Sequence, residues 1–351
     1  MNSRERVRSA IDHTSPDRIP AAFEAVESVV EKLLKHYQYS QIAQLYDRYR
    51  IDIAPITPTY TGPPLKSYTD AKGNLVKKNF WGFESTFYEN GIERYEITEI
   101  TSFYPLNGVE TPADIDHYEW PNPDWFDYKS VEDQITQYPD KAIITGHEGP
   151  FQIATSLMNM EHLFMLMLDK PELVHRFLDR MVMFELEYYE RLLIAGKGRI
   201  DILRPHDDYG TQISLLFSID MWREFFKENT KRLVDLAHHY GAYYQQHSCG
   251  AIRPLISEFV ECGVDVLEPL QKVQGLDPQS LQDEFGGKIT FHGGIDTQSL
   301  LPFGTPQQVN DEVQLYKRCL NKDGGYILMA SQAFESDVPI ENIEAVYCSD
   351  R

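Results

Sequence analysis

Cysteine is scarce in this sequence, with only four copies in 351 residues. They are Cys249, Cys262, Cys319 and Cys348. A disulfide framework needs denser and more regular spacing, so the thiols are expected to be reduced. Residues 1–20 also lack the apolar core of a secretory signal. Both absences predict a cytoplasmic protein.

Long apolar runs and an excess of basic residues are also missing. The most apolar stretch, Phe151–Leu168, is interrupted by Gln152, Asn159 and Glu161 and is too polar and too short to span a bilayer. Acidic residues outnumber basic ones by 54 to 33, which gives a formal charge of -21. Such a charge repels phosphate backbones and anionic lipid surfaces. Nucleic-acid and membrane partners are therefore not expected.

Short β-rich runs alternate with longer helical patterns, which is typical of parallel strands joined by helices. Helical patterns cover Pro171–Gly196 and Trp222–Tyr240, and a third helix is predicted after a capping Thr305. Eight β-rich runs predict an α/β fold of the (β/α)8 TIM-barrel type, in one domain over residues 1–351. The runs are 18–23, 51–56, 141–146, 199–205, 242–247, 264–269, 288–293 and 325–330.

A TIM barrel usually needs about 250 residues, so part of this chain must lie outside the barrel. Residues 66–100 alternate polar and apolar side chains and contain turn signals at Lys72-Gly73 and Asn90-Gly91. We therefore predict an insertion after the second strand, over residues 58–138. It is expected to hold an antiparallel β excursion and short helices, and to cover the barrel mouth with Trp81.

Polar side chains gather where the predicted strands end, and that end of a barrel carries the chemistry. A binding pocket at this rim is favoured over ordinary polar loops. The residues at the rim are Glu24, His147, Glu148, Arg204, His206, Asp207, Asp208, His247, Cys249, Glu268, His292, Asp296, Ser331 and Gln332.

His247-Ser248-Cys249 is the sharpest feature, because an imidazole and a thiolate two residues apart can bind one zinc ion. A catalytic zinc normally takes three protein ligands, and Glu268 ends the next strand. Glu268 is then either the third ligand or a general acid or orienting carboxylate. Asp207 and Asp208 either bind a cation or substrate, or form a solvated turn or helix cap.

The motifs "HSCGAIRPLISEFVECGVDVLEPLQ", "FHGGIDTQSLLPFGTP" and "GGYILMASQAFESDVPIENIEAVY", with "GPFQIATSL" and "HDDYGTQ", resemble the uroporphyrinogen decarboxylase superfamily. The resemblance covers nearly the whole chain and implies a (β/α)8 barrel. The true decarboxylase has an arginine-rich stretch after its first strand, whereas this chain has Glu24 and Glu27 there. Carboxylates at that place would repel a porphyrinogen with many acid groups.

The resemblance is therefore closer to the branch of methylcobalamin:thiol methyltransferases. That branch implies a zinc site of a His-x-Cys motif and a distant cysteine, and Gln332 stands at the cysteine's place. His247, Cys249 and Glu268 are the metal ligands that the resemblance implies here. Cobalamin on a partner carrier protein and a homodimer are also implied. We predict zinc-assisted methyl transfer involving a thiol or methyl ether and that corrinoid carrier.

Catalytic roles are expected for Asp208, Glu268 and His292. The predicted substrate-binding residues are His147, Glu148, Arg204, His206, Asp207, Trp81 and Gln332. One alternative is a metal-free decarboxylase-like carboxy-lyase, in which Arg204 binds a small carboxylic acid and Asp208 supports the developing charge. A non-catalytic binding role is a third reading.

Overall fold

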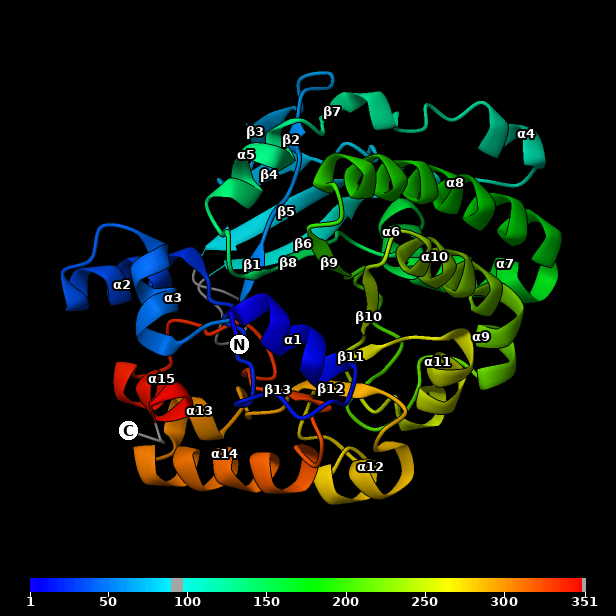
Figure 1. Ribbon diagram of the computed structural model, residues 1–351. Coiled ribbons are helices and arrows are strands. Elements are labelled where there is room, and N and C mark those ends of the chain that lie inside the picture. Colours follow the sequence, from blue (N-terminus) through cyan, green and yellow to red (C-terminus); the bar gives the residue numbers. More distant parts are fainter. Residues whose placement is uncertain (90–96, 349–351) are drawn as a thin grey trace.

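A curled, parallel β-sheet forms the centre of the computed structural model, which describes residues 1–89 and 97–348 (Figure 1). Its seven strands follow the order β1-β8-β9-β10-β11-β12-β13. Each strand matches one of the last seven predicted β-rich runs, with β11 ending one residue beyond its run, so the parallel α/β fold is confirmed. The strands are β1 (Ile53–Pro55), β8 (Ala142–Thr145), β9 (Ile200–Leu203), β10 (Tyr243–His247), β11 (Val266–Leu270), β12 (Thr290–Gly293) and β13 (Tyr326–Ile327).

The first predicted strand, at residues 18–23, does not form, and the sheet has seven strands rather than eight. The segment is extended and makes an isolated parallel bridge between Ala21 and Leu328. Ala22 donates to the Leu328 carbonyl, and Asp52 donates to the Ala21 carbonyl. Pro20 has no N–H to donate, which limits the ladder on this segment. The segment therefore hydrogen-bonds near both edge strands without becoming a strand itself.

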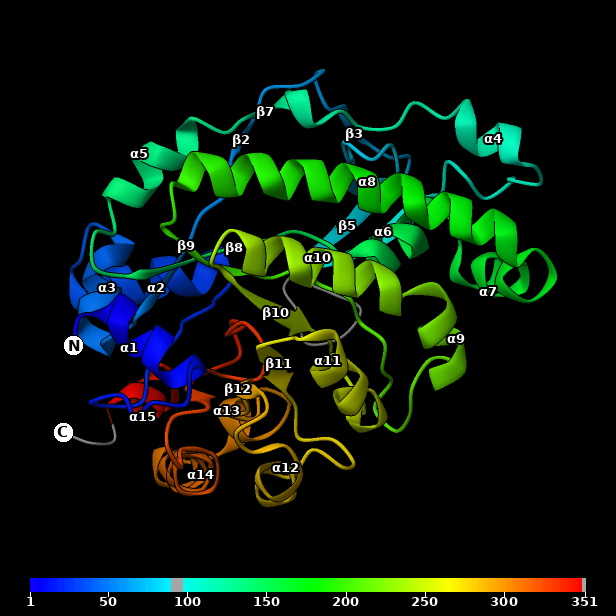
Figure 2. The ribbon, with the colours of Figure 1, turned by 45° about the vertical axis from the view of Figure 1, so that its right-hand side comes forward.

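Helices cover the outer face of the sheet (Figure 2). The predicted helix at Pro171–Gly196 is confirmed, and so is the one after Thr305 with its capping box. The pattern at Trp222–Tyr240 belongs to two helices that break at Phe226. The helices are α1 (Ser3–Ile11), α2 (Glu27–Tyr37), α3 (Ile42–Tyr49), α4 (Pro112–Asp116), α5 (Ser130–Thr136), α6 (Pro150–Leu157), α7 (Met160–Asp169), α8 (Pro171–Gly196), α9 (Ile219–Phe225), α10 (Lys227–His239), α11 (Ile256–Cys262), α12 (Pro278–Phe285), α13 (Leu300–Phe303), α14 (Pro306–Leu320) and α15 (Ile340–Tyr347).

Helix α1 covers the end of the sheet where the strands begin. Val7 and Ile11 are buried and pack with inward-facing residues such as Ile53, Ile202 and Val266 in one apolar cluster. The Ala10 carbonyl accepts a hydrogen bond from Gly325, just before β13. The buried face of α1 therefore completes an apolar layer inside the curled sheet, at the end where the strands begin.

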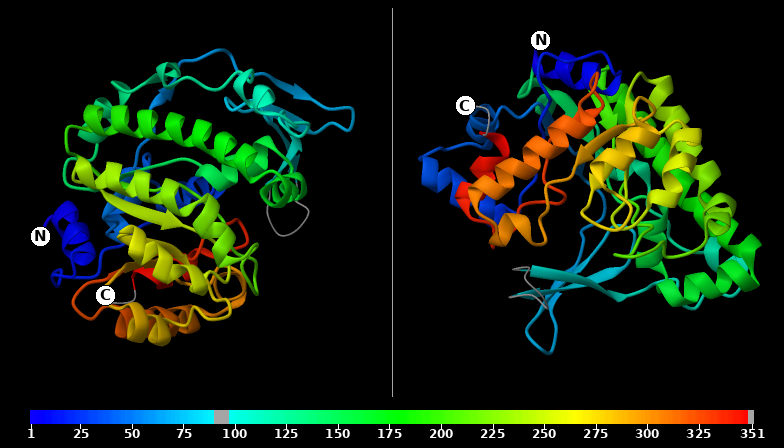
Figure 3. Two further views of the ribbon diagram at one scale, coloured as in Figure 1. Left: turned by 90° about the vertical axis from the view of Figure 1, so that its right-hand side faces the viewer. Right: turned by 90° about the horizontal axis from the view of Figure 1, so that it is seen from below.

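Between β1 and β8 the chain forms an antiparallel excursion, seen on the lower side of the right-hand view in Figure 3. The Lys72-Gly73 turn lies between β3 and β4, whereas Asn90-Gly91 lies outside the described residues. Short helices α4 and α5 follow, as expected. The strands of this region are β2 (Thr59–Tyr60), β3 (Ser67–Thr69), β4 (Leu75–Lys78), β5 (Glu84–Glu89), β6 (Ile97–Phe103) and β7 (Phe126–Asp127).

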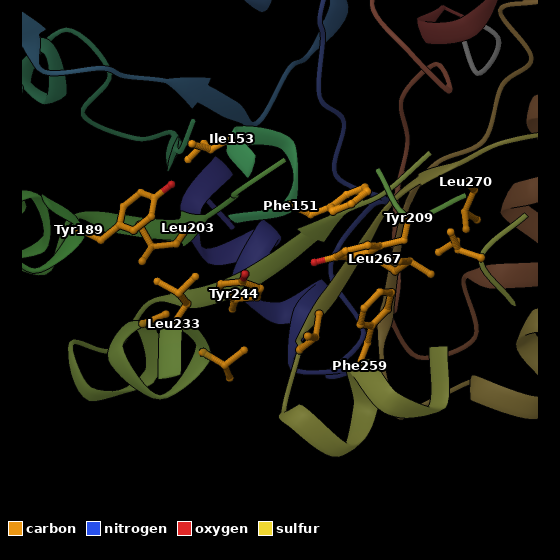
Figure 4. Packing of buried hydrophobic residues seen from close by; sticks show 14 of the residues in the cluster. Phe151, Ile153, Tyr189, Leu203, Tyr209, Leu233, Tyr244, Phe259, Leu267 and Leu270 are labelled. Atoms are coloured by element: carbon orange, nitrogen blue, oxygen red, sulfur yellow. The ribbon is translucent and has the colours of Figure 1, made fainter. Parts of the chain in front are cut away.

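A second, larger apolar core fills the space between the outer face of the sheet and its helices (Figure 4). Tyr189 of α8, Tyr244 of β10 and Phe259 of α11 are buried there, at 2% exposure or less. In the described residues, none of the helices is long and apolar enough to cross a membrane.

Candidate functional site

The alternation of side chains along a strand decides which predicted residues reach the mouth of the curled sheet. Beyond β9, His206 forms a parallel bridge with His247 on one side and with Glu148 on the other. Neighbouring residues in register point to the same face, so these three side chains share the inner face. Arg204 lies two residues before His206, so its side chain also points to the inner face.

Three potential metal ligands converge at this mouth: His247, Asp208 and Cys249. The His247 Nε2 atom lies 3.5 Å from the Asp208 carboxylate and 3.6 Å from the Cys249 sulfur. All three ligand atoms lie within 4.8 Å of one another. Zinc bonds of about 2.0–2.3 Å place tetrahedral ligands roughly 3.3–3.7 Å apart. The two distances from Nε2 of His247 match this spacing, so the cluster is a candidate metal site.

Glu268 does not join this cluster, which corrects the ligand set implied by the sequence. Its carboxylate lies 2.7 Å from Nδ1 of His247, on the opposite side of the ring from Nε2. A carboxylate on the second nitrogen orients a metal-binding imidazole and makes it more basic. Of the two roles left open for Glu268, this contact favours the orienting one, and Asp208 rather than Glu268 lies with His247 and Cys249.

The charges of this cluster depend on one another. Burial opposes the charged form of His247, but Glu268, with Asp208 and Cys249, raises the pKa of His247 well above its ordinary value. Burial also opposes ionisation of Asp208, yet its hydrogen bonds with His247 and with the Cys249 backbone lower its pKa. Burial raises the pKa of the Cys249 thiol despite the nearby His247. Without a cation, the imidazole is charged and the sulfur is protonated.

Gln332, in the loop after β13, contacts Cys249. Its Nε2 donates to the Cys249 sulfur at 2.7 Å. Amide donors stabilise a sulfur that carries negative charge. Gln332 is therefore a hydrogen-bonding neighbour of the sulfur.

Two further imidazoles, of His206 and His292, face the same region. The His206 ring lies 4.7 Å from the His247 ring. Burial, with a contribution from Arg204, lowers the pKa of His206 to about 3. Burial also lowers the pKa of His292 to about 4. Both rings are therefore neutral at physiological pH.

Arg204 is held between two carboxylates. Its guanidinium contacts Glu24 directly and lies 3.8 Å from Glu268. Only 13% of its side chain is exposed. The positive charge is thus already balanced within the protein.

His147 and Asp207, which were predicted to contact substrate, lie against the helices on the outer face rather than at the mouth. The His147 ring stacks on Tyr189 of α8, with ring centres 5.2 Å apart. Asp207 accepts hydrogen bonds from the Gln152 backbone and the Tyr209 hydroxyl, and so caps α6. Burial raises the pKa of Asp207 to about 7 despite these hydrogen bonds. Both residues stabilise the packing of helices on the sheet.

Trp81 is also absent from the mouth. It is 1% exposed and packs against Phe184 of α8, with ring centres 4.8 Å apart. The structure therefore gives it a place in the apolar core, between the antiparallel excursion and α8.

One residue of the candidate site was not predicted from the sequence: Gln245. It lies on β10, two residues before His247, and is fully buried. Its amide contacts both Glu268 and His292. The alternation in "YYQQH" was the available signal, because it places Gln245 on the same face as His247.

A metal-competent cluster at the carboxyl ends of parallel strands defines an α/β enzyme with its site at the sheet mouth. The chain belongs to the uroporphyrinogen decarboxylase (URO-D) family, whose model matches residues 104–349. A methylcobamide:CoM methyltransferase MtaA of Methanosarcina barkeri is 23% identical over 258 residues, covering 73% of this chain and 71% of that protein.

Two further proteins from Methanosarcina mazei are similar to the chain. A methylated-thiol–coenzyme M methyltransferase is 23% identical over 197 residues, covering 56% of this chain and 49% of that protein. The solved structure of a methyltransferase has a TM-score of 0.68 at 16% identity, covering 99% of this chain and 98% of that one. The structural likeness shows the shared fold, and the named relatives agree with the methyltransferase-like branch.

Proposed function

We propose that this protein transfers a methyl group between the corrinoid of a separate carrier protein and a thiol or methyl ether, with a zinc ion bound by His247, Cys249 and Asp208. The observation that carries the proposal is the spacing of the three ligand atoms, at 3.5 and 3.6 Å from Nε2 of His247. The two Methanosarcina relatives are methyltransferases, which supports the same reaction class.

A zinc ion in this place would supply a Lewis acid that keeps a bound thiol deprotonated at neutral pH, or polarises an ether oxygen. The residues around it have separate tasks. Glu268 fixes the ring of His247 through Nδ1, so that Nε2 faces the mouth. Burial opposes the charged form of Glu268, but His247 and then Arg204, 3.8 Å away, hold its pKa below the ordinary value. Gln332 holds the sulfur of Cys249 in position.

We also propose that the curled sheet closes into a barrel. The hydrogen bonds of Ala21 and Ala22 toward Asp52 and Leu328 support a ring in which residues 18–23 fill the gap between β13 and β1. We also propose a cytoplasmic location, which the four free thiols support. A homodimer stays a prediction.

The metal-free carboxy-lyase is the weaker alternative because of the contacts of Arg204. That reading needs Arg204 to receive a substrate carboxylate, yet Glu24 and Glu268 already occupy it. A third carboxylate would add repulsion.

The test is the metal content of the purified protein, measured together with the loss of methylcobalamin absorbance in the presence of thiols. Bound zinc at one ion per chain is expected, and Cys249→Ser and Asp208→Asn should each lose it. Cys348→Ser is the matched control, because Cys348 lies at the end of α15 rather than at the mouth. A metal-free protein with full activity, or release of carbon dioxide without cobalamin, would overturn the proposal.

A further inference from the structure

The buried side chain of His292 has one ring nitrogen without a partner. Its Nδ1 lies 3.1 Å from the carbonyl oxygen of the Gln245 amide. Its Nε2 is buried and has no hydrogen-bond partner in the described structure. The side chain is only 1% exposed. A buried polar atom without a partner is costly, which points to a group that binds there.

The contacts of Gln245 decide which kind of group His292 can receive. The Gln245 Nε2 donates to Glu268, 3.4 Å away, and a carboxylate can only accept. The carbonyl of Gln245 must then face His292, and Nδ1 of His292 carries the hydrogen. In a neutral imidazole the other nitrogen is an acceptor. Nε2 of His292 therefore needs a hydrogen-bond donor.

The neutral state of His292 agrees with this assignment. Burial is the largest cause of its lowered pKa, and nearby Arg204 lowers it further against the attraction of Glu268. A ligand that offers only acceptors, such as a carboxylate or sulfonate, would leave Nε2 unsatisfied.

The charges at the mouth point to the same kind of ligand. Glu24 and Asp208 are 37% and 44% exposed in their side chains, and Glu148 is partly exposed on the same inner face. Among the lysines and arginines of residues 1–89 and 97–348, Arg204 forms the ion pairs with carboxylates of the mouth. Its charge is shared by Glu24 and Glu268. The mouth thus holds more carboxylates than lysine or arginine side chains.

We propose that the small-molecule substrate at this mouth carries a cationic group with N–H donors, such as a primary ammonium, which Glu24, Glu148 and Nε2 of His292 receive. The inference rests on the proposed function only in placing the reacting thiol at the cluster of His247, Asp208 and Cys249. An acidic thiol is correspondingly disfavoured.

The experiment compares three short thiols by isothermal titration calorimetry with the purified protein: cysteamine, which is cationic, mercaptoethanol, which is neutral, and mercaptopropionate, which is anionic. We expect affinity to fall in that order. The ratio of the cysteamine and mercaptopropionate dissociation constants is then measured in Glu148→Gln and Glu24→Gln. Differences in thiol acidity cancel when these ratios are compared with that of the wild type.

Each of the two substitutions should reduce the preference for cysteamine by about fivefold, as expected for the loss of one nearby charge. Glu24→Gln also frees Arg204 to attract the anion. Asp133→Asn on the outer helix α5 removes one negative charge elsewhere and should leave the ratio unchanged.

Equal or tighter binding of mercaptopropionate would overturn the inference, and so would the absence of binding by all three thiols. A preference that does not change in Glu148→Gln and Glu24→Gln would overturn the assignment of those carboxylates. If cysteamine is preferred but no methyl transfer occurs with any thiol or methyl ether, the proposed function fails and the binding inference stands.

Discussion

At the scale of single residues, the site depends on a carboxylate that does not belong to the ligand cluster. Glu268 fixes the ring of His247 and is itself held by Arg204 and Gln245. The sequence suggested Glu268 as a ligand because it ends the strand beside His247. It could not show that the carboxylate meets Nδ1, because that depends on the rotation of the imidazole ring.

We expect Glu268→Gln to weaken zinc binding by about 10–100-fold, because an orienting partner of a metal-binding histidine has effects of that size. The measurement is competition with a chromophoric chelator. Glu258→Gln is the control, since Glu258 is also buried and ion-paired but contacts Arg223 and Lys227. Unchanged zinc affinity in Glu268→Gln would contradict the orienting role.

Glu185 of α8 provides a pH-dependent prediction. It is fully buried, and neither carboxylate oxygen has a partner in the described structure. Burial, with the nearby charges of Asp207 and Glu148, raises the pKa of Glu185 well above its ordinary value of 4.5. The native state then keeps a proton that the unfolded state loses above that value. Glu185 therefore lowers stability as the pH rises, by up to about 1.4 kcal/mol per pH unit.

Glu185→Met should remove this slope and stabilise the protein more at pH ~8 than at pH ~5. Urea unfolding at both values measures it. Glu187→Gln on the same helix is the control, because Glu187 is half exposed and pairs with Arg191. An equal gain in stability at both pH values would show that Glu185 is ionised in the native protein.

At the scale of elements, the seven strands of the central sheet were predictable because each is marked by a β-rich run in the sequence. The exception, residues 18–23, has the composition of a strand but contains Pro20, which cannot donate to a ladder. The pattern at Trp222–Tyr240 predicted one helix, because periodicity does not detect a break at a single residue such as Phe226.

The sequence also predicts only in part which polar residues after the strands point inward and which point outward. Alternation separates the inward His206 from the outward Asp207 once the inner face is known. The sequence does not say which face is inner in a run such as "ILRPHDD", since the strand ends before these residues. His147 and Asp207 were assigned to the mouth for that reason.

The capping box of α14 makes a prediction for one helix. The Thr305 side chain accepts from the Gln308 backbone, and the Gln308 side chain accepts from the Thr305 backbone. Thr305→Ala should lower the free energy of unfolding by about 1 kcal/mol. Ser28→Ala near the start of α2 is the control, because the Ser28 hydroxyl has no partner in the described structure. Equal effects of the two substitutions in urea unfolding would contradict the role of the cap.

At the scale of the whole molecule, Asp52 joins distant parts of the chain. It is fully buried and accepts hydrogen bonds from Arg6 of α1, from Arg18 and from the Ala21 backbone. These contacts link α1 and the extended segment to the start of β1. Long-range pairs of this kind leave no periodic signal in the sequence.

Asp52→Ala should destabilise the protein by about 3–5 kcal/mol, because it leaves buried positive charge without its partner. Asp220→Ala is the control, since Asp220 pairs with Arg223 at the surface and its side chain is 89% exposed. That change should cost less than about 1 kcal/mol. Similar shifts of the two variants in urea unfolding would exclude a structural role for the Asp52 network.

The position of α1 also has a practical consequence. Because this helix covers the end of the sheet where the strands begin, the amino terminus lies on the side opposite the strand ends that form the mouth. A protein immobilised on a sensor chip through an amino-terminal tag would present its mouth to the solution. Binding of the proposed corrinoid carrier could then be recorded in real time, with the mouth unobstructed by the support.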